Sequence, residues 1–79
     1  MKTIFICGNS KYQELIKEKH MVLANGGNLV LTSLTDNNLD LIKKSDVVLV
    51  YEKDYEQDPV VVKQVRFAEK LQKPIRFYE

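Results

Sequence analysis

"VVLVY", residues 47–51, is the stretch that decides the fold of this chain. Its side chains are apolar at odd and even positions alike, whereas a strand with one face in water alternates apolar and polar residues. A run that is apolar on both faces is typical of a strand in a parallel sheet that helices cover from both sides. We therefore expect the neighbouring segments to supply helices and further parallel strands.

The segments before residue 47 alternate between strand and helix patterns. Residues 3–7 (TIFIC) and 28–31 (NLVL) are short apolar runs, which predict two strands. Residues 11–25 between them predict a helix, because apolar side chains recur at helical spacing at positions 12, 15, 16, 22 and 23. Residues 38–44 predict a second helix, of about two turns.

Several residues mark where the helices begin and end. Asn9 or Ser10 is the expected cap of the first helix, with Gln13 completing a capping box, and Gly26-Gly27 ends that helix. The cap candidates of the second helix are Asp36, Asn37 and Asn38. After a polar loop at 52–58, the dipeptide Asp58-Pro59 begins a third helix that runs to about Leu71, and residues 75–78 (IRFY) form the last strand.

This order of elements predicts one domain, residues 1–79, of the α/β class. The expected architecture is a flavodoxin-like or Rossmann-like three-layer sandwich around a four-stranded parallel sheet in the strand order 2-1-3-4. Ligands of such sheets bind beyond the carboxyl ends of the strands, where the strand order reverses. Here that place lies between the first and third strands, so we expect the turn at Gly8–Ser10 and the loop at 52–58 to lie side by side.

The same order leaves one face of the sheet with a single helix. One helix cannot cover four strands, so the third strand should be partly bare on that side, and exposed apolar patches commonly mark interfaces. We therefore predict a homodimer that buries the face of the third and fourth strands or the adjacent first helix.

Composition excludes several classes of function. The formal net charge of +1 gives no general attraction to nucleic acid or to an anionic membrane, and no apolar run is long enough to span a bilayer. The single cysteine, Cys7, cannot form an internal disulfide and is expected in the core, and the lone histidine belongs to no metal-binding motif, so we expect no metal or other cofactor. The start of the chain does not resemble a secretory signal, and the cytoplasm is the expected compartment.

Six residues are candidates for a binding site. Gly8, Asn9 and Ser10 form either a simple connection or a turn whose backbone N–H groups bind a phosphate or a sugar hydroxyl. Tyr12 either packs in the core or stacks on a base, and Glu52 is the carboxylate best placed for a sugar hydroxyl. The sixth residue, Gln64, falls inside the apolar arc of the third helix, where it makes either a structural hydrogen bond or a contact with a ligand.

Three stretches of the sequence resemble the nucleoside 2-deoxyribosyltransferase-like family. They are "IFICGNSKYQELIKEKHMVLANGGNLVL", "LIKKSDVVLVY" and "VKQVRFAEKLQKPIRFYE", which together cover nearly the whole chain. The resemblance implies a Rossmann-like fold, a nucleoside or nucleotide ligand, a homo-oligomer and glycosidic-bond chemistry. The family's nucleophile is a glutamate four residues before an alanine on the last helix, and that position is Gln64 here, four before Ala68. An amide cannot supply the negative charge that a carboxylate brings to glycosyl transfer.

Other departures from the family pattern also concern the site. Asn9 replaces a serine, Lys53 and Asp54 replace glycines that contact the sugar, and the segment between the second and third strands is short. We therefore predict a non-catalytic protein that binds a nucleoside or nucleotide as a sensor or a sequestering protein, and the brevity of the chain suggests a phage origin. One alternative is a minimal nucleoside deoxyribosyltransferase or nucleotide N-glycosidase that uses Glu52 or Glu56. The other is a protein-interaction module that retains only the fold.

Overall fold

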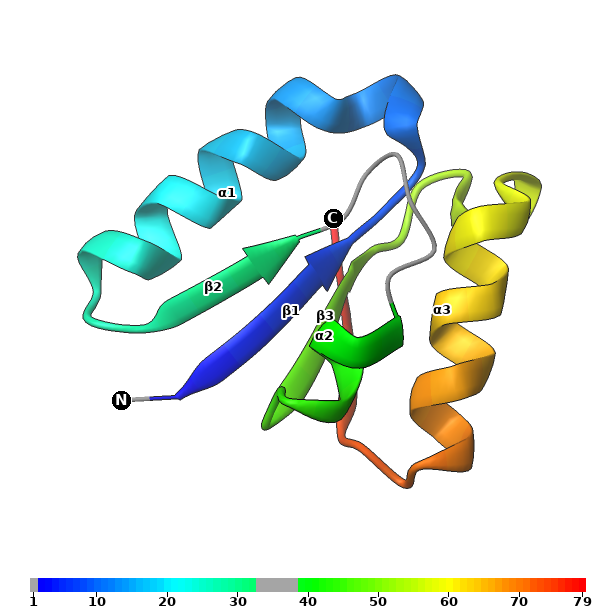
Figure 1. Cartoon of the computed structure of the whole chain (residues 1–79). Helices are drawn as coiled ribbons and strands as arrows, with labels where there is room; N and C mark the ends of the chain where they lie inside the picture. The colour runs from blue at the N-terminus through cyan, green and yellow to red at the C-terminus, as the bar shows by residue number, and fades with distance from the viewer. Residues whose placement is uncertain (1, 33–38) are drawn as a thin grey trace.

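The computed structural model of the chain describes residues 2–32 and 39–79. Four strands, β1 (Thr3–Cys7), β2 (Leu29–Thr32), β3 (Val47–Tyr51) and β4 (Ile75–Tyr78), form one parallel sheet in the order β2-β1-β3-β4. The predicted class, sheet and strand order are confirmed (Figure 1). The cap candidates Asp36, Asn37 and Asn38 lie outside the described residues.

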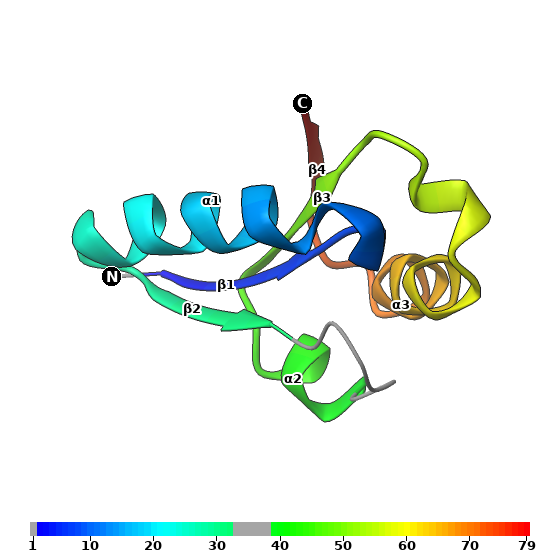
Figure 2. The same cartoon turned by 90° about the horizontal axis from the view of Figure 1, so that it is seen from above.

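In the part of the chain that the structure describes, three α-helices pack on the sheet. Among these, α1 (Gln13–Asn25) lies on one face, whereas α2 (Leu39–Lys43) and α3 (Pro59–Lys70) share the opposite face (Figure 2). Two short 3₁₀ turns, η1 (Ser10–Tyr12) and η2 (Tyr55–Gln57), precede α1 and α3. The sheet thus has the three-layer arrangement that the sequence predicts.

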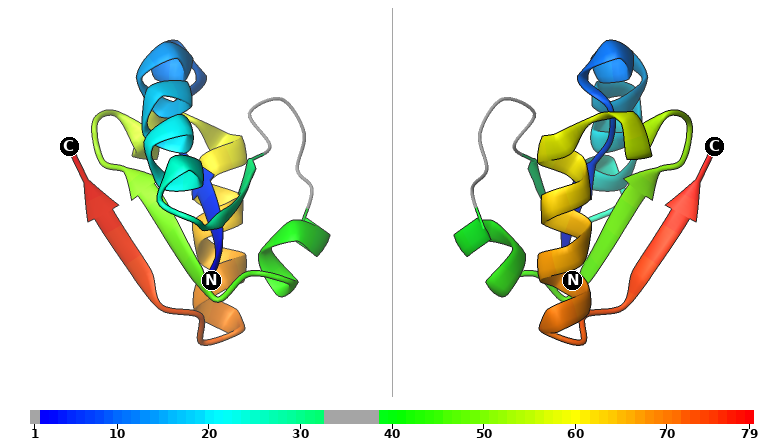
Figure 3. Two further views of the ribbon diagram at one scale, coloured as in Figure 1. Left: turned by 90° about the vertical axis from the view of Figure 1, so that its left-hand side faces the viewer. Right: turned by 90° about the vertical axis from the view of Figure 1, so that its right-hand side faces the viewer.

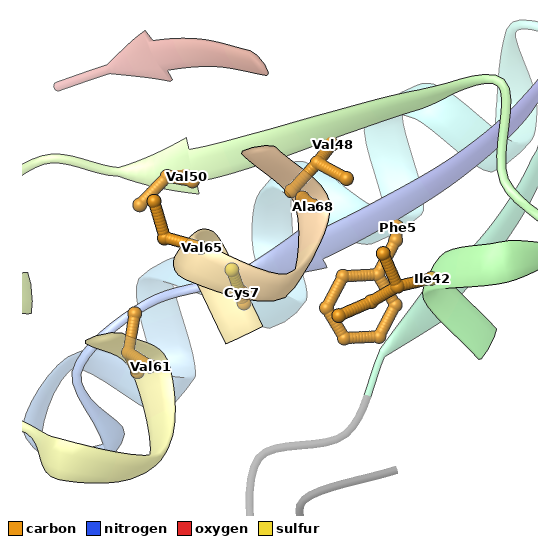
Figure 4. Packing of buried hydrophobic residues seen from close by; sticks show 8 residues of the cluster. All are labelled: Phe5, Cys7, Ile42, Val48, Val50, Val61, Val65 and Ala68. Atoms are coloured by element: carbon orange, nitrogen blue, oxygen red, sulfur yellow. The ribbon is translucent and has the colours of Figure 1, made fainter. Parts of the chain in front are cut away.

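The larger core cluster lies between the sheet and the pair α2 and α3. Strand residues Phe5, Val48 and Val50 are fully buried there, in contact with side chains from both helices (Figure 4). The smaller cluster, under α1, is formed by Ile6, Ile16, Val30 and Tyr51. Since successive strand residues point to opposite faces, β3 contributes to both clusters, as its doubly apolar pattern predicts.

The face under α1 is the less completely covered of the two. On β3, Val48 and Val50 are fully buried beneath α3, whereas Val47 and Leu49, which point to the α1 side, are only half-buried. The strand β4 lies at the outer edge of the sheet, with its face on the α1 side beyond the helix (Figure 3). A single helix therefore leaves apolar surface on this side, as expected.

The start of α1 differs from the prediction. The 3₁₀ turn η1 occupies residues 10–12, so α1 begins at Gln13 and no capping box forms between Ser10 and Gln13. Asn9 caps the 3₁₀ turn η1, because its side chain accepts a hydrogen bond of 3.0 Å from the backbone N–H of Lys11, whereas the cap residue of α1 itself is Tyr12, which makes no side-chain capping bond. The predicted start of α3 is confirmed: the Asp58 carboxylate accepts from the N–H of Val60 at 3.1 Å, and Pro59 is the first helical residue.

Candidate functional site

The turn after β1 and the loop after β3 lie side by side, as the strand order predicts. Three hydrogen bonds join them across more than forty residues of sequence. The Asn9 side-chain amide donates to the Asp54 carbonyl (2.8 Å), the Tyr12 hydroxyl donates to the Asp54 carboxylate (2.6 Å), and the Ser10 N–H donates to the Asp58 carboxylate (3.3 Å). The crevice at the carboxyl end of the sheet is thus closed by direct contacts between its two walls.

These contacts occupy the groups that would have received a phosphate. A phosphate at a helix N-terminus binds free backbone N–H groups. Here the N–H of Ser10 donates to Asp58 and that of Lys11 donates to Asn9. A phosphate in this position would also meet the negative charge of Asp58, which repels it. The turn does not offer a phosphate the open amides that the sequence suggested.

Gly8 is required by packing rather than by an approaching ligand. A Cβ atom on this residue would lie 2.8 Å from Ile16 Cδ1 and 2.8 Å from Tyr51 Cβ. Real Cβ contacts of this length are essentially never seen. The absence of a side chain at Gly8 therefore lets α1 approach the end of β3. This favours the interpretation of the turn as a simple connection between β1 and α1.

The other candidate residues are not gathered in one cavity. Glu52 continues the ladder of the sheet, with its N–H donating to the Tyr78 carbonyl at 2.8 Å, and its side chain is exposed. Gln64 lies inside the apolar face of α3, as predicted, and is fully buried. A fully buried amide does not reach a substrate in this conformation, so Gln64 touches no sugar from there. Two pockets in the described part of the chain are each lined by other residues and by none of the six candidates.

The first of these pockets is a groove of about 310 Å³ beside α1, above the ends of β3 and β4. We call it the α1-face groove, and it is lined by Leu15, Glu18, Lys19, Val22, Tyr51, Tyr78 and Glu79. Its apolar wall is open to solvent, since Leu15 is 46% exposed and Val22 is 65% exposed. Leu15 and Val22 are two of the apolar positions whose helical spacing predicts this helix. They lie on its flank, where the sheet beneath does not reach them.

The rings of Tyr51 and Tyr78 form the floor of the α1-face groove, with their centroids 5.3 Å apart. The ring of Tyr12, which does not line the groove, lies 5.4 Å from that of Tyr51. The Lys19 ammonium lies 5.2 Å from the centroid of the Tyr78 ring, within range of a cation–π interaction. Burial raises the pKa of Tyr78 to about 12, so this hydroxyl is neutral at physiological pH. The groove therefore presents rings and aliphatic carbon, with charge confined to Glu18, Lys19 and Glu79.

A second pocket, of about 320 Å³, lies on the opposite side of β4. It is bounded by Tyr55, Arg66 and Phe77, and the rings of Tyr55 and Phe77 are 5.2 Å apart. Within residues 2–32 and 39–79, no cluster of three or more His, Cys, Asp or Glu side chains could hold a metal ion. None of the helices in those ranges is both long and apolar enough to cross a membrane.

Comparison with protein-family models, with curated proteins and with solved structures found no match for this chain.

Proposed function

We propose that this chain is a protein-interaction domain without catalytic activity, and that its first partner is a second copy of itself. The observation that supports this most directly is the α1-face groove. Leu15 and Val22 present exposed aliphatic side chains beside the rings of Tyr51 and Tyr78, on the face of the sheet that one helix covers incompletely. Exposed apolar surface of this kind is typical of a surface that another protein covers.

A matched pair of substitutions on α1 tests this proposal. Val22 and Met21 are each 65% exposed on the same helix, but only Val22 lines the groove. We expect Val22→Asn to weaken self-association about tenfold, because the apolar area that it removes is worth on the order of 1.4 kcal/mol. Met21→Asn should leave self-association unchanged. Analytical ultracentrifugation over a range of concentrations measures both, and equal effects of the two substitutions would contradict the proposal.

A second candidate function is binding of a nucleoside monophosphate near Tyr12. The specific observation in its favour is that the ammonium groups of Lys11 and Lys53 lie 5.9 Å and 5.5 Å from the centroid of the Tyr12 ring. Two ammonium groups can bind a phosphate where the backbone N–H groups are occupied, and the exposed Glu52 carboxylate can accept hydrogen bonds from a sugar. The ammonium groups of Lys11 and Lys53, and not the backbone N–H groups of the turn, would then bind the phosphate.

Calorimetric titration with deoxynucleosides and their monophosphates tests this second function. Binding of a monophosphate should be weakened at least fivefold by Lys53→Ala and left unchanged by Lys63→Ala, an exposed lysine on α3. Absence of heat with every nucleoside and monophosphate would exclude it. Release of free base during the titration would instead support the enzyme alternative.

A further inference from the structure

The outer edge of β4 offers unpaired backbone groups. The β3–β4 ladder uses the carbonyls of Pro74 and Tyr78, which accept from Val48 and Glu52. In a parallel sheet, the N–H and C=O groups of one residue point to the same side of the strand, and this side alternates from residue to residue. Since Pro74 and Tyr78 bond to β3, the backbone groups of Ile75 and Phe77 point away from β3. No strand lies beyond β4 in the described sheet (Figure 3). The side chain of Phe77 is 47% exposed. An edge of this kind is a template for a further strand.

A second copy of β4 fits this edge in an antiparallel direction about a two-fold axis. In that arrangement both copies use the same edge, and residues with outward backbone groups face each other as hydrogen-bonded pairs. Placing the axis at Arg76 would set two guanidinium groups directly opposite, which is unfavourable. Placing it at Ile75 would pair Phe77 with Lys73, whose N–H already donates to the Ala68 carbonyl at 3.0 Å and is not available to a further strand. Placing it at Phe77 avoids both problems and buries two exposed rings against each other.

The register centred on Phe77 also brings opposite charges together. Arg76 and Tyr78 point to the α1 side, as their β3 partners Leu49 and Tyr51 do. Arg76 of the second copy would stand opposite Tyr78, a residue of the α1-face groove. The groove also contains the carboxylates of Glu18 and Glu79. A guanidinium group entering there meets an aromatic ring and two acidic groups, and Arg76 has no ion pair within the described part of its own chain.

We propose that two copies of this chain join through antiparallel β4 strands centred on Phe77, and that Arg76 of each copy occupies the α1-face groove of the other. The result is one continuous eight-stranded sheet in which the groove is filled by the partner. This inference rests on the proposed function, because it specifies how the proposed self-association takes place.

Three single cysteine variants determine the register. In an antiparallel hydrogen-bonded pair the Cα atoms lie about 5.5 Å apart, within the range that a disulfide spans. Phe77→Cys should therefore form a covalent dimer on mild oxidation, whereas Ile75→Cys and Arg76→Cys should not. The native Cys7 is buried and its pKa is raised to about 12, so it does not compete. A covalent dimer from either of the other two variants, and none from Phe77→Cys, would overturn the register.

Charge reversal tests the contact of Arg76 with the groove. Arg76→Glu should weaken dimerisation at least tenfold, and adding Glu18→Arg on the same chain should restore most of it. Leu29→Glu, a substitution at an exposed residue of the opposite edge strand, is the control and should have no effect. A wild-type dimer that Val22→Asn weakens but Arg76→Glu does not would overturn this inference and leave the proposed function intact. A wild-type chain that stays monomeric would overturn both.

Discussion

At the scale of single residues, Gly8 shows how a small residue between a strand and a helix can be misread as a ligand site. We predict that Gly8→Ala destabilises the fold by about 1–3 kcal/mol, because its Cβ would overlap Ile16 and Tyr51. Gly26→Ala, where the nearest atom to a Cβ is 3.3 Å away, should cost less. Urea denaturation of both variants measures the difference, and a smaller loss for Gly8→Ala than for Gly26→Ala would contradict the packing role.

Gln64 leads to a prediction about charge in the core. We expect Gln64→Glu to lower the free energy of unfolding at pH 7 by about 4 kcal/mol, because burial raises the pKa of a carboxyl by about 3 units or more, each worth about 1.36 kcal/mol. The folded state then binds a proton more tightly than the unfolded state does. The loss should therefore be small near pH 4, where both states are protonated, and should grow as the pH rises above about 4.3, the ordinary pKa of glutamate.

The control for this substitution is Gln13→Glu, since Gln13 is exposed in the first turn of α1. It should change the stability by less than about 0.5 kcal/mol. Thermal denaturation at pH 4.5 and at pH 7 gives both values. Equal stability of Gln64→Glu and the wild type at pH 7 would contradict full burial of residue 64. We expect no release of base from deoxynucleosides by the variant, because its carboxyl would stay inside the core.

At the scale of the elements, Asp58 joins the beginnings of two helices. It caps α3 through Val60 and accepts from Ser10 at the start of η1. We predict that Asp58→Ala lowers the free energy of unfolding by about 1–2 kcal/mol. Glu56→Ala, at an exposed residue of the same loop, should be near neutral. Urea denaturation compares the two, and a similar loss for both would show that the hydrogen bonds of Asp58 contribute little.

The elements also show how far sequence reasoning reaches. The doubly apolar run at 47–51 and the Asp58-Pro59 start of α3 predicted the sheet and the third helix, because both signals are local and specific. The helical period predicted α1, but it did not predict that Leu15 and Val22 are exposed, because the period does not give the width of the sheet beneath the helix. The hydrogen bonds that join Asp54 and Asp58 to the turn after β1 connect residues distant in sequence, so no local sequence pattern predicts them.

At the scale of the whole molecule, the arrangement of layers determines where a partner can bind. Two helices bury the α2 and α3 side of β3, while α1 leaves Val47 and Leu49 half-buried and opens a groove toward β4. The crevice at the carboxyl end of the sheet is instead closed by hydrogen bonds between the turn after β1 and the loop after β3. The α1-face groove and the strand edge beside it remain open, and these are the surfaces that we propose a second copy of the chain covers.

The proposed dimer is tested most simply by the molar mass of the wild-type chain in solution, by light scattering during size-exclusion chromatography at micromolar concentration. We expect a species with twice the 9.2 kDa mass of one chain, which dissociates on dilution. A single species of 9.2 kDa at every concentration would contradict it.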